Sequence, residues 1–308
     1  MELTKRIGEK ARDLGFDLAG VTPAYPVPGV DAYRAWIKQG FHGEMGYMAR
    51  PDRVARREDP GLILPGVRSL VCVGMNYYPG EVMESLLRDP ARGRISNYAW
   101  GADYHALMLP RLEALADFIV AEVGRMGGRP ANARAYVDTG PVLERAYAAK
   151  AGLGFIGKNT SLIHPRRGAF LFLGEVLVDA ALQPSGGMVG VDCGICQRCL
   201  DACPTGALLA PGVLDARRCL SYLTIEHKGA ILVSLRASMG NRIYGCDECL
   251  LVCPWQRFVQ KTAVDAFRAA SVDHVAPLLM DLMGMDEEAF QRRFTGTPIL
   301  RIGRARLL

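Results

Sequence analysis

The sequence predicts an α/β (α+β) domain followed by a compact cysteine-rich module and a mostly helical tail. Residues 1–185 contain a single cysteine, whereas residues 186–258 contain the other eight. Residues 183–187, Gln-Pro-Ser-Gly-Gly, have the composition of a linker between the two. We therefore expect three parts, namely the first domain over residues 1–185, the cysteine-rich module over 186–258 and the helical tail over 259–308.

The first domain alternates helical and strand patterns. A helix over residues 3–14 ends at Gly15, and a strand over residues 16–21 follows. The further expected elements are a strand over residues 68–76, a helix over 103–125, a strand over 133–137, a helix over 141–151, and a hairpin of 160–163 with 169–178. The strand over 68–76 is almost entirely apolar, as at the centre of a sheet. Pro110 predicts a kink in its helix or a later start.

Composition places the chain among ordinary globular proteins. Half of its 308 residues are hydrophobic and its formal net charge is +5, which is too mild to establish a nucleic-acid partner. Residues 1–15 lack the apolar core of a signal peptide. The most apolar long stretch, residues 169–182, contains Glu175 and Asp179 and cannot span a membrane. We expect a cytoplasmic monomer without membrane contact.

The cysteine spacing carries the strongest chemical signal. One run reads Cys-x2-Cys-x2-Cys-x3-Cys-Pro over residues 193–204, and a second reads Cys-x2-Cys-x3-Cys-Pro over 246–254, with Cys219 upstream. In two-cluster ferredoxins the cysteine before proline ligates the other 4Fe-4S cluster. We therefore assign one cluster to Cys193, Cys196, Cys199 and Cys253, and the other to Cys203, Cys219, Cys246 and Cys249.

Structural zinc is the alternative interpretation of paired cysteines. A zinc site closes with four ligands and requires neither a third cysteine in one run nor a following Cys-Pro. Cys72, inside the apolar strand, is expected to be an inert core thiol. Two adjacent clusters conduct electrons, and the first domain is large enough to hold the chemistry that accepts them.

A second notable segment begins at Asp138, where a strand ends before a helix. From local pattern alone, Asp138 or Thr139 is expected to cap that helix. The glycine-rich stretch over residues 152–160 matches neither a Walker loop nor a Rossmann fingerprint. Its glycines either form turns or let the backbone approach a large flat ligand.

Taken together, these segments resemble the epoxyqueuosine reductase family. The resemblance rests on residues 138–141, 152–160, 98–105 and 219–226 and on both cysteine runs, and it covers nearly the whole chain. It implies a nitroreductase-like cobalamin domain in which electrons from the two clusters reach cobalamin. The implied reaction reduces epoxyqueuosine to queuosine at the wobble position of tRNA. Asp138 matches the proton donor, a role that requires burial to raise the pKa of its carboxyl.

The resemblance also implies contact residues. Those expected to bind cobalamin are Arg53, Ser96, Tyr98, Asp138, Lys158, Asn159, Ser161 and Ser221. The cobalamin is expected to be base-off without a protein histidine ligand, because the Asp103-x-His105 segment lacks the glycine of a cobalt-ligating motif. Asp103 is then a helix cap and His105 a non-ligand. The candidates for tRNA phosphate contacts are Arg166, Arg167, Arg217, Arg218, Lys228, Arg236 and Arg242.

Partners and alternatives follow from the same resemblance. The substrate is expected to be tRNA carrying epoxyqueuosine, and the reductant a flavodoxin- or ferredoxin-type protein. Longer family members carry a helical repeat domain after the cluster module, and we expect none after Leu308. The alternatives are a non-catalytic ferredoxin-type electron carrier and a corrinoid iron–sulfur reductase of another substrate, such as a reductive dehalogenase.

Overall fold

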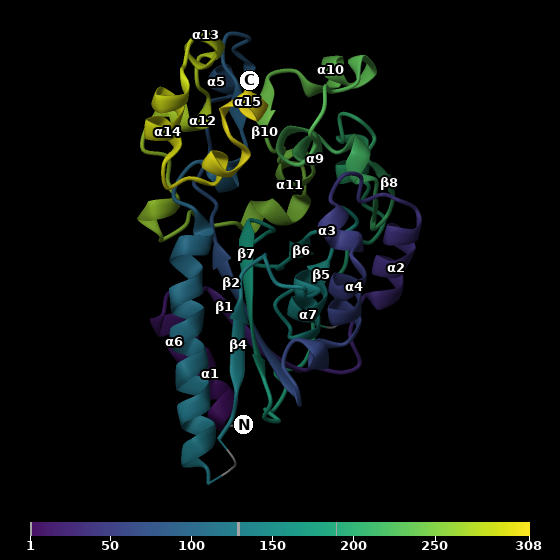
Figure 1. Ribbon diagram of the computed structural model, residues 1–308, viewed down its shortest axis with the longest axis vertical. Helices are drawn as coiled ribbons and strands as arrows, with labels where there is room; N and C mark the ends of the chain where they lie inside the picture. Colours follow the sequence, from purple (N-terminus) through teal and green to yellow (C-terminus); the bar gives the residue numbers. More distant parts are fainter. Residues whose placement is uncertain (1, 128–129, 189) are drawn as a thin grey trace.

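The first part of the chain is built around a four-stranded sheet (Figure 1). The computed structural model describes residues 2–127, 130–188 and 190–308. The strands are β1 (Leu18–Pro23), β2 (Ser69–Asn76), β7 (Leu171–Val178) and β4 (Ala133–Tyr136), in the order β1-β2-β7-β4. All three pairings are antiparallel. Every residue of β2 is buried, which explains its apolar sequence.

Helices cover both faces of this sheet (Figure 1). On one face lie α1 (Glu2–Asp13) and the long α6 (Tyr104–Arg125), which share a core that includes Ile7, Leu112 and Ile119. On the other face lies α7 (Glu144–Lys150), whose Tyr147 and Ala148 are buried. The expected mixed helix and strand domain is therefore present.

Two long segments outside the central sheet precede α6 in the chain. Between β1 and β2 the chain forms α2 (Val30–Lys38), α3 (Gly46–Ala49), α4 (Pro51–Glu58) and η1 (Pro60–Leu62). Between β2 and α6 it forms α5 (Glu84–Arg88), β3 (Arg94–Ile95) and η2 (Asn97–Ala99). Pro110 does not delay α6, which starts at Tyr104 as the pattern predicts.

Three sequence-based expectations are wrong in detail. The first strand begins at Leu18 and not at residue 16. Helix α7 begins at Glu144, so neither Asp138 nor Thr139 caps it; the N-cap is Leu143, without a side-chain hydrogen bond. The expected hairpin is reduced to one antiparallel bridge, between His164 and Gly168. Beyond it, β6 (Leu162–Ile163) pairs with β5 (Phe155–Ile156), while β7 joins the central sheet.

The cysteine module is a chain of short elements. They are α8 (Arg198–Asp201), β8 (Leu208–Ala210), β9 (Val213–Leu214), η3 (Ala216–Arg218), α9 (Leu220–Ile225), α10 (Val233–Met239), β10 (Arg242–Tyr244), α11 (Glu248–Leu251) and η4 (Pro254–Phe258). Strand β10 pairs in parallel with β3 of the first domain. The module is thus joined to the first domain by backbone hydrogen bonds.

The tail is helical, as expected. It contains η5 (Asp265–Phe267), α12 (Val272–Val275), α13 (Leu279–Met283), α14 (Glu287–Phe294), η6 (Pro298–Ile302) and α15 (Arg304–Leu307). Its Phe290 and Phe294 share a core with Trp100 of the first domain and Tyr244 of the module. Within the described residues, no helix combines the length and apolarity needed to cross a bilayer.

Candidate active site and cluster domain

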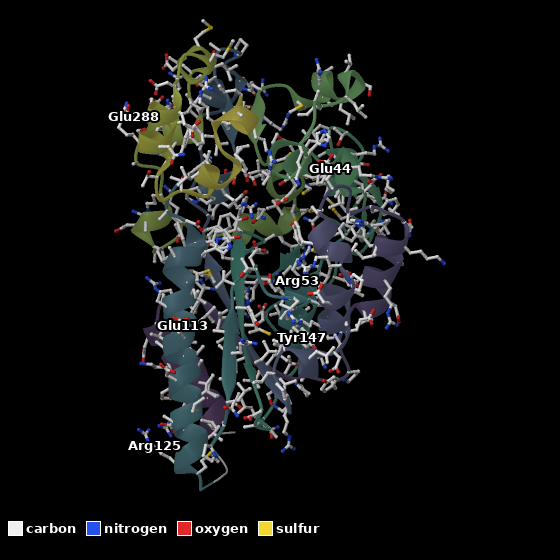
Figure 2. All side chains as sticks on the ribbon, viewed as in Figure 1. Glu44, Arg53, Glu113, Arg125, Tyr147 and Glu288 are labelled. Atoms are coloured by element: carbon white, nitrogen blue, oxygen red, sulfur yellow. The ribbon has the colours of Figure 1, made fainter. Side chains whose placement is uncertain are left out.

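Asp138 lies in the loop that follows β4. Its backbone is in the left-handed region, with φ 56°, which is uncommon for a residue other than glycine. Val137 before it is buried in the core. The loop is held from α4, where the Arg53 guanidinium donates to the carbonyl oxygen of Thr139 at 3.2 Å (Figure 2). Because such conformations persist only where their surroundings enforce them, the fold fixes this side chain in place.

The start of α6 supplies the partners of Asp138. The Tyr104 hydroxyl donates to Asp138 Oδ2 at 2.9 Å, and His105 Nε2 lies 3.6 Å from the same oxygen. On its other side, His105 Nδ1 lies 2.8 Å from Asp103 Oδ1. Asp103 Oδ1 also accepts from the His105 backbone N–H, which confirms Asp103 as the N-cap of α6. The imidazole therefore lies between two carboxylates.

This arrangement decides where a proton is held. The hydrogen bond to Asp103, and then the contact with Asp138, raise the pKa of His105 to about 9. Burial acts to raise the pKa of Asp138, but His105 and the Tyr104 hydrogen bond outweigh it and hold that pKa below its ordinary value. The pKa of Asp138 is therefore lowered in this structure, whereas the proton-donor role requires it to be raised. At neutral pH the proton resides on His105.

Asp138 opens into a hollow of about 400 Å³. The hollow is lined by residues from the first domain (Trp36, Met45, Met48, Tyr98, Asp103, Tyr104, His105, Asp138, Arg145), the module (Leu214, Ala216, Cys219, Ser221, Tyr222, Ile225, Glu226, Tyr244) and the tail (Pro298, Arg301). Its walls are largely apolar or aromatic. His105 Nε2 is buried without a hydrogen-bond partner among the described residues. Apolar walls around a few convergent polar groups are the composition of a small-molecule or cofactor site.

Two further acids, the half-buried Glu144 and the buried Glu175, interact electrostatically with Asp138. Glu175, in the middle of β7, is fully buried, and neither of its carboxyl oxygens has a hydrogen-bond partner among the described residues. Burial, then the neighbouring Glu144 and Asp138, raise the pKa of Glu175 well above its ordinary value. Burial and then Asp138 raise the pKa of Glu144 to about 8. Burial therefore favours the neutral form of both carboxyls.

The eight module cysteines gather into two groups. Cys193, Cys196, Cys199 and Cys253, hereafter the outer cysteines, line one hollow of about 760 Å³. Cys203, Cys219, Cys246 and Cys249 are hereafter the inner cysteines; burial raises the pKa of Cys249, and the other three inner thiols raise it further. Four thiols in each group match the number of ligands that a 4Fe-4S cluster requires. Among the described residues, no three of them are arranged to hold a single metal ion. Cys72 is fully buried in β2, where burial raises its pKa, as expected of a core thiol.

Backbone and side-chain donors support these cysteines. The backbone N–H of Lys158 donates to Cys193 Sγ at 3.4 Å, and that of Ala207 to Cys203 Sγ at 3.2 Å. Lys158 Nζ donates to the carbonyl oxygen of Gly194 at 2.7 Å. Asn159 Nδ2 donates to the carbonyl oxygen of Cys249 at 3.1 Å. Residues 158–159 therefore connect an outer cysteine loop with an inner one.

The glycine-rich stretch serves chain packing. A Cβ on Gly154 would lie 2.4 Å from the carbonyl oxygen of Ile163, and one on Gly152 would lie 2.3 Å from that of Gly186. These glycines allow β5 to pair with β6 and the linker to pass close by. Gly152, with φ 86°, lies in a turn, which is one of the two interpretations left open. Close packing of the chain on itself, which neither interpretation named, accounts for both positions.

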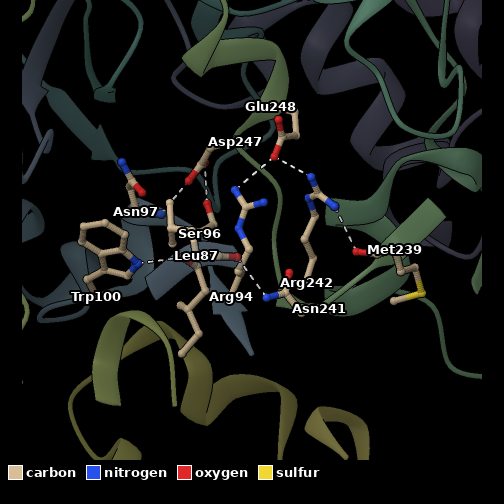
Figure 3. A network of polar contacts seen from close by, with 11 residues as sticks. Leu87, Arg94, Ser96, Asn97, Trp100, Met239, Asn241, Arg242, Asp247 and Glu248 are labelled. Atoms are coloured by element: carbon tan, nitrogen blue, oxygen red, sulfur yellow. Dashed lines mark hydrogen bonds and ion pairs between the residues drawn. The ribbon is translucent and has the colours of Figure 1, made fainter. Parts of the chain in front are cut away.

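Ser96 belongs to a polar network beside the inner cysteines (Figure 3). Its hydroxyl donates to Asp247 Oδ1 at 2.6 Å, and Asp247 lies between Cys246 and Cys249. The guanidinium groups of Arg94 and Arg242 both donate to Glu248 Oε1, at 3.0 and 2.5 Å. The network fixes the loop that presents two of the inner cysteines.

The predicted cobalamin contacts thus fall into two sets. Tyr98, Asp138 and Ser221 line the hollow. The side chains of Arg53, Ser96, Lys158 and Asn159 instead bond to the Asp138 loop or the cysteine loops, and the Ser161 backbone N–H donates to Asn159 Oδ1. Sequence reasoning did not assign roles to Tyr104 or Arg301. Tyr104 lay within a quoted segment, whereas nothing local marked Arg301 of the tail.

The candidate phosphate contacts differ in availability. Arg242 is paired with Glu248, Arg217 with Asp215, and Arg167 with Asp17. Arg218 donates to the carbonyl oxygen of Thr205. Arg166, Lys228 and Arg236 are exposed. Arg217 and Arg218 are also exposed but are already engaged, so Arg166, Lys228 and Arg236 are the exposed members of the set without a salt bridge among the described residues.

Comparison with known proteins defines the class. Residues 192–256 match a model described as a 4Fe-4S double cluster binding domain, and residues 57–139 match one described as epoxyqueuosine reductase QueG, DUF1730. Fold, hollow and cluster domain together define an iron–sulfur oxidoreductase. The chain is 42% identical over 308 residues to the epoxyqueuosine reductases of Pseudomonas aeruginosa (99% of this chain, 83% of that one) and Escherichia coli (100% and 79%). It belongs to the epoxyqueuosine reductase family.

Solved structures agree with this assignment. One is an epoxyqueuosine reductase with an epoxyqueuosine-modified tRNA stem loop, at a TM-score of 0.87 and 30% identity over 99% of this chain and 79% of that one. Another is the Bacillus subtilis enzyme with its aspartate catalytic loop swung out of the active site, at a TM-score of 0.85 and 30% identity over the same shares. The double-cluster model favours iron–sulfur clusters over zinc, and the family favours a reductase over a simple electron carrier.

Proposed function

We propose that this protein reduces epoxyqueuosine to queuosine at the wobble position of tRNA. In this proposal electrons pass from two 4Fe-4S clusters to a bound cobalamin, and Asp138 donates a proton. The observation that carries it is that Asp138 and Cys219 line the same hollow. A site that receives electrons from the inner cysteines thus lies beside a group that can deliver a proton. The relative solved with an epoxyqueuosine-modified stem loop supports the choice of substrate.

The overall reaction sets what the site must supply. Removing an epoxide oxygen as water breaks two C–O bonds, leaves a carbon–carbon double bond, and consumes two electrons and two protons. Cobalamin, when bound, supplies strongly reducing cobalt next to the substrate. The remaining tasks belong to the chain: it must position the substrate, exclude water and hold a proton near the departing oxygen.

The proton is held by the Asp138–His105 pair. In the open hollow the Asp138 side chain is 53% exposed and the charged pair is stable, with the proton on His105. Covering the hollow with a cofactor and a nucleoside removes water, which disfavours two separated charges. The proton then moves from His105 towards Asp138, and Tyr104 keeps the carboxyl oriented through its 2.9 Å hydrogen bond. Asp138 is then the proton donor, and His105 is the residue from which Asp138 receives that proton.

The other residues act at different distances from the cofactor. Tyr98 and Ser221 are placed to touch a cobalamin in the hollow. Arg53 positions the Asp138 loop, whereas Ser96, Lys158, Asn159 and Ser161 support the cysteine loops. His105 would not serve as a cobalt ligand, since its Nδ1 lies 2.8 Å from Asp103 Oδ1 and its Nε2 lies 3.6 Å from Asp138 Oδ2, so these residues would suit a base-off cobalamin without a histidine ligand. The proposed reductant is a flavodoxin- or ferredoxin-type protein. We further propose that the protein acts in the cytoplasm, where its tRNA substrate is found, and that it acts as a monomer.

The decisive experiment analyses tRNA nucleosides. Protein reconstituted anaerobically with iron, sulfide and cobalamin is incubated with epoxyqueuosine-containing tRNA and a reductant. We expect epoxyqueuosine to be replaced by queuosine only when cobalamin is included. Unchanged epoxyqueuosine, with both clusters loaded and cobalamin bound, would contradict the proposed substrate.

A further inference from the structure

The outer and inner cysteines lie at different ends of the proposed electron path. Cys219, an inner cysteine, lines the Asp138 hollow. The outer cysteines line a separate hollow that shares no lining residue with it. If both groups hold clusters, as the proposed function requires, electrons enter at the outer cysteines and leave towards Asp138. The surface around the outer cysteines is therefore where an electron donor must approach.

That surface has exposed apolar side chains. Ile195, in the turn between Cys193 and Cys196, is fully exposed at 100%. Leu251 and Phe258 on the adjoining α11 and η4 are exposed at 42% and 40%. Two open hollows of about 760 and 860 Å³ adjoin here and share Cys253, Arg198 and Arg257 among their lining residues. An isoleucine with no internal contacts on a cluster-binding turn contributes nothing to the core and is available to a partner.

The same surface carries three exposed arginines, of which Arg257 stacks on Phe258 with its guanidinium carbon 4.6 Å from the ring centre. Arg198 and Arg257 are exposed, and so is Arg166 in the turn beside Gln256. Across residues 2–127, 130–188 and 190–308, none of the three forms a salt bridge. Two acids also lie here: Asp192 accepts from the Gly194 backbone N–H at 2.6 Å, and Asp201 is exposed. The positive charge of Lys158 balances one of these two acids, so the side chains around the hollow of the outer cysteines carry a net positive charge.

We propose that this docking face, formed by Ile195, Leu251, Phe258, Arg166, Arg198 and Arg257, binds an acidic one-electron carrier protein that reduces the outer cluster. An apolar centre with an arginine rim is the composition of a protein-binding surface. Electron-transfer encounters are small, on the order of 1,200 Å² or less, and rely on charge to guide association. Each encounter oxidises the carrier by one electron and reduces the cluster by one, so two encounters supply one deoxygenation.

The test compares a protein reductant with a small one. Anaerobic stopped-flow measures bleaching of the iron–sulfur absorbance by reduced flavodoxin, an acidic carrier, and separately by dithionite, which needs no docking face. We expect Arg198→Glu/Arg257→Glu to slow reduction by flavodoxin roughly 10- to 100-fold at low salt, because charge steering raises association rates by about that factor. The rate with dithionite should stay unchanged. Wild-type reduction by flavodoxin should slow as salt rises, and that of the variant should not.

Three further variants test which property of the docking face matters. Ile195→Ser should weaken flavodoxin binding, measured by calorimetry, without altering the absorbance of the clusters. Arg198→Lys/Arg257→Lys should restore most of the rate with flavodoxin. Arg292→Glu, at an exposed position on the distant α14, should behave as wild type.

The opposing outcomes are distinct. Equal rates for wild type and the double charge reversal with flavodoxin would overturn the docking face. Equal loss with flavodoxin and dithionite would overturn it too, since the variant then damages the cluster. A variant that binds tRNA more weakly but accepts electrons normally would make this an RNA surface instead. Absence of any bleaching by dithionite in the wild type would refute the proposed function together with this inference.

Discussion

The cysteine module and the Asp138 hollow bring their residues together in different ways. Seven of the eight module cysteines come from two short runs, and only Cys219 stands apart. The hollow instead collects Tyr104, Asp138, Cys219 and Arg301 from four distant parts of the chain. Cluster ligands must sit on tight turns around one small object, so spacing reveals them. An acid–base site needs only that side chains meet, and any route of the chain can achieve this.

The two regions also differ in charge. The hollow places an imidazole with a raised pKa between two carboxylates, one of which, Asp138, also interacts electrostatically with Glu144 and Glu175. The outer cysteines face solvent among arginines. Proton chemistry is thereby kept at one end of the proposed path and electron delivery at the other. The following experiments test that division, from the largest expected effect to the smallest.

Replacing the proposed donor should stop the reaction. Asp138→Asn keeps the shape of the side chain but carries no acidic proton, so turnover should fall roughly 100- to 10,000-fold. Iron content and cobalamin binding should be unchanged, as judged by absorbance spectra. Asp281→Asn, at an exposed position on α13, is the matched control and should remain active. Normal turnover by Asp138→Asn would remove this residue from the mechanism.

Pairs of cysteine substitutions should reveal the crossed ligand sets. Cys193→Ser/Cys253→Ser alters only the outer group and should leave about half of the iron, since each group holds one four-iron cluster. Cys219→Ser/Cys253→Ser alters both groups and should leave little. Cys72→Ala should retain all of it. Iron and labile sulfide analysis measures this. More iron in Cys219→Ser/Cys253→Ser than in Cys193→Ser/Cys253→Ser would mean that Cys253 belongs with Cys219.

The proton reserve should govern the alkaline limit of activity. As pH rises through the His105 pKa of about 9, the imidazole loses its proton and single-turnover rates should fall. Asp103→Asn removes the carboxylate that contributes most to this shift, while asparagine still caps α6. The alkaline limb should then move down towards the ordinary histidine pKa of about 6.5. An unchanged pH profile would show that His105 does not supply the proton.

The buried acids should make stability depend on pH. Because the folded-state pKa of Glu175 is raised, its contribution is complete below the unfolded pKa of about 4.3 and is lost as pH rises. Glu175→Gln should flatten this decline by up to about 1.4 kcal/mol per pH unit, measured by urea unfolding between pH 5 and 8. The exposed Glu287→Gln should leave the decline as in wild type. A parallel decline in Glu175→Gln would mean that this carboxyl is ionised when buried.

Much of the fold followed from local pattern. The apolar run of β2, the period of α6 and the helical tail all appear where the sequence predicts them. The errors lie where long-range pairing decides. β7 pairs with β2 and β4 and so cannot form the expected hairpin with residues 160–163. Asp138 has the sequence of a helix cap, yet its left-handed backbone delays α7 until Glu144.

The sequence by itself predicts the two cysteine groups, because most thiolates that share a cluster follow fixed spacings in tight turns. It also marked Asp138 through the surrounding motif. Only the tertiary structure decided that His105 holds the proton, that Arg301 of the tail reaches the same hollow, and that Lys158 and Asn159 connect the cysteine loops. These contacts join segments far apart in the chain, and their energies depend on burial and distance, which no local pattern records.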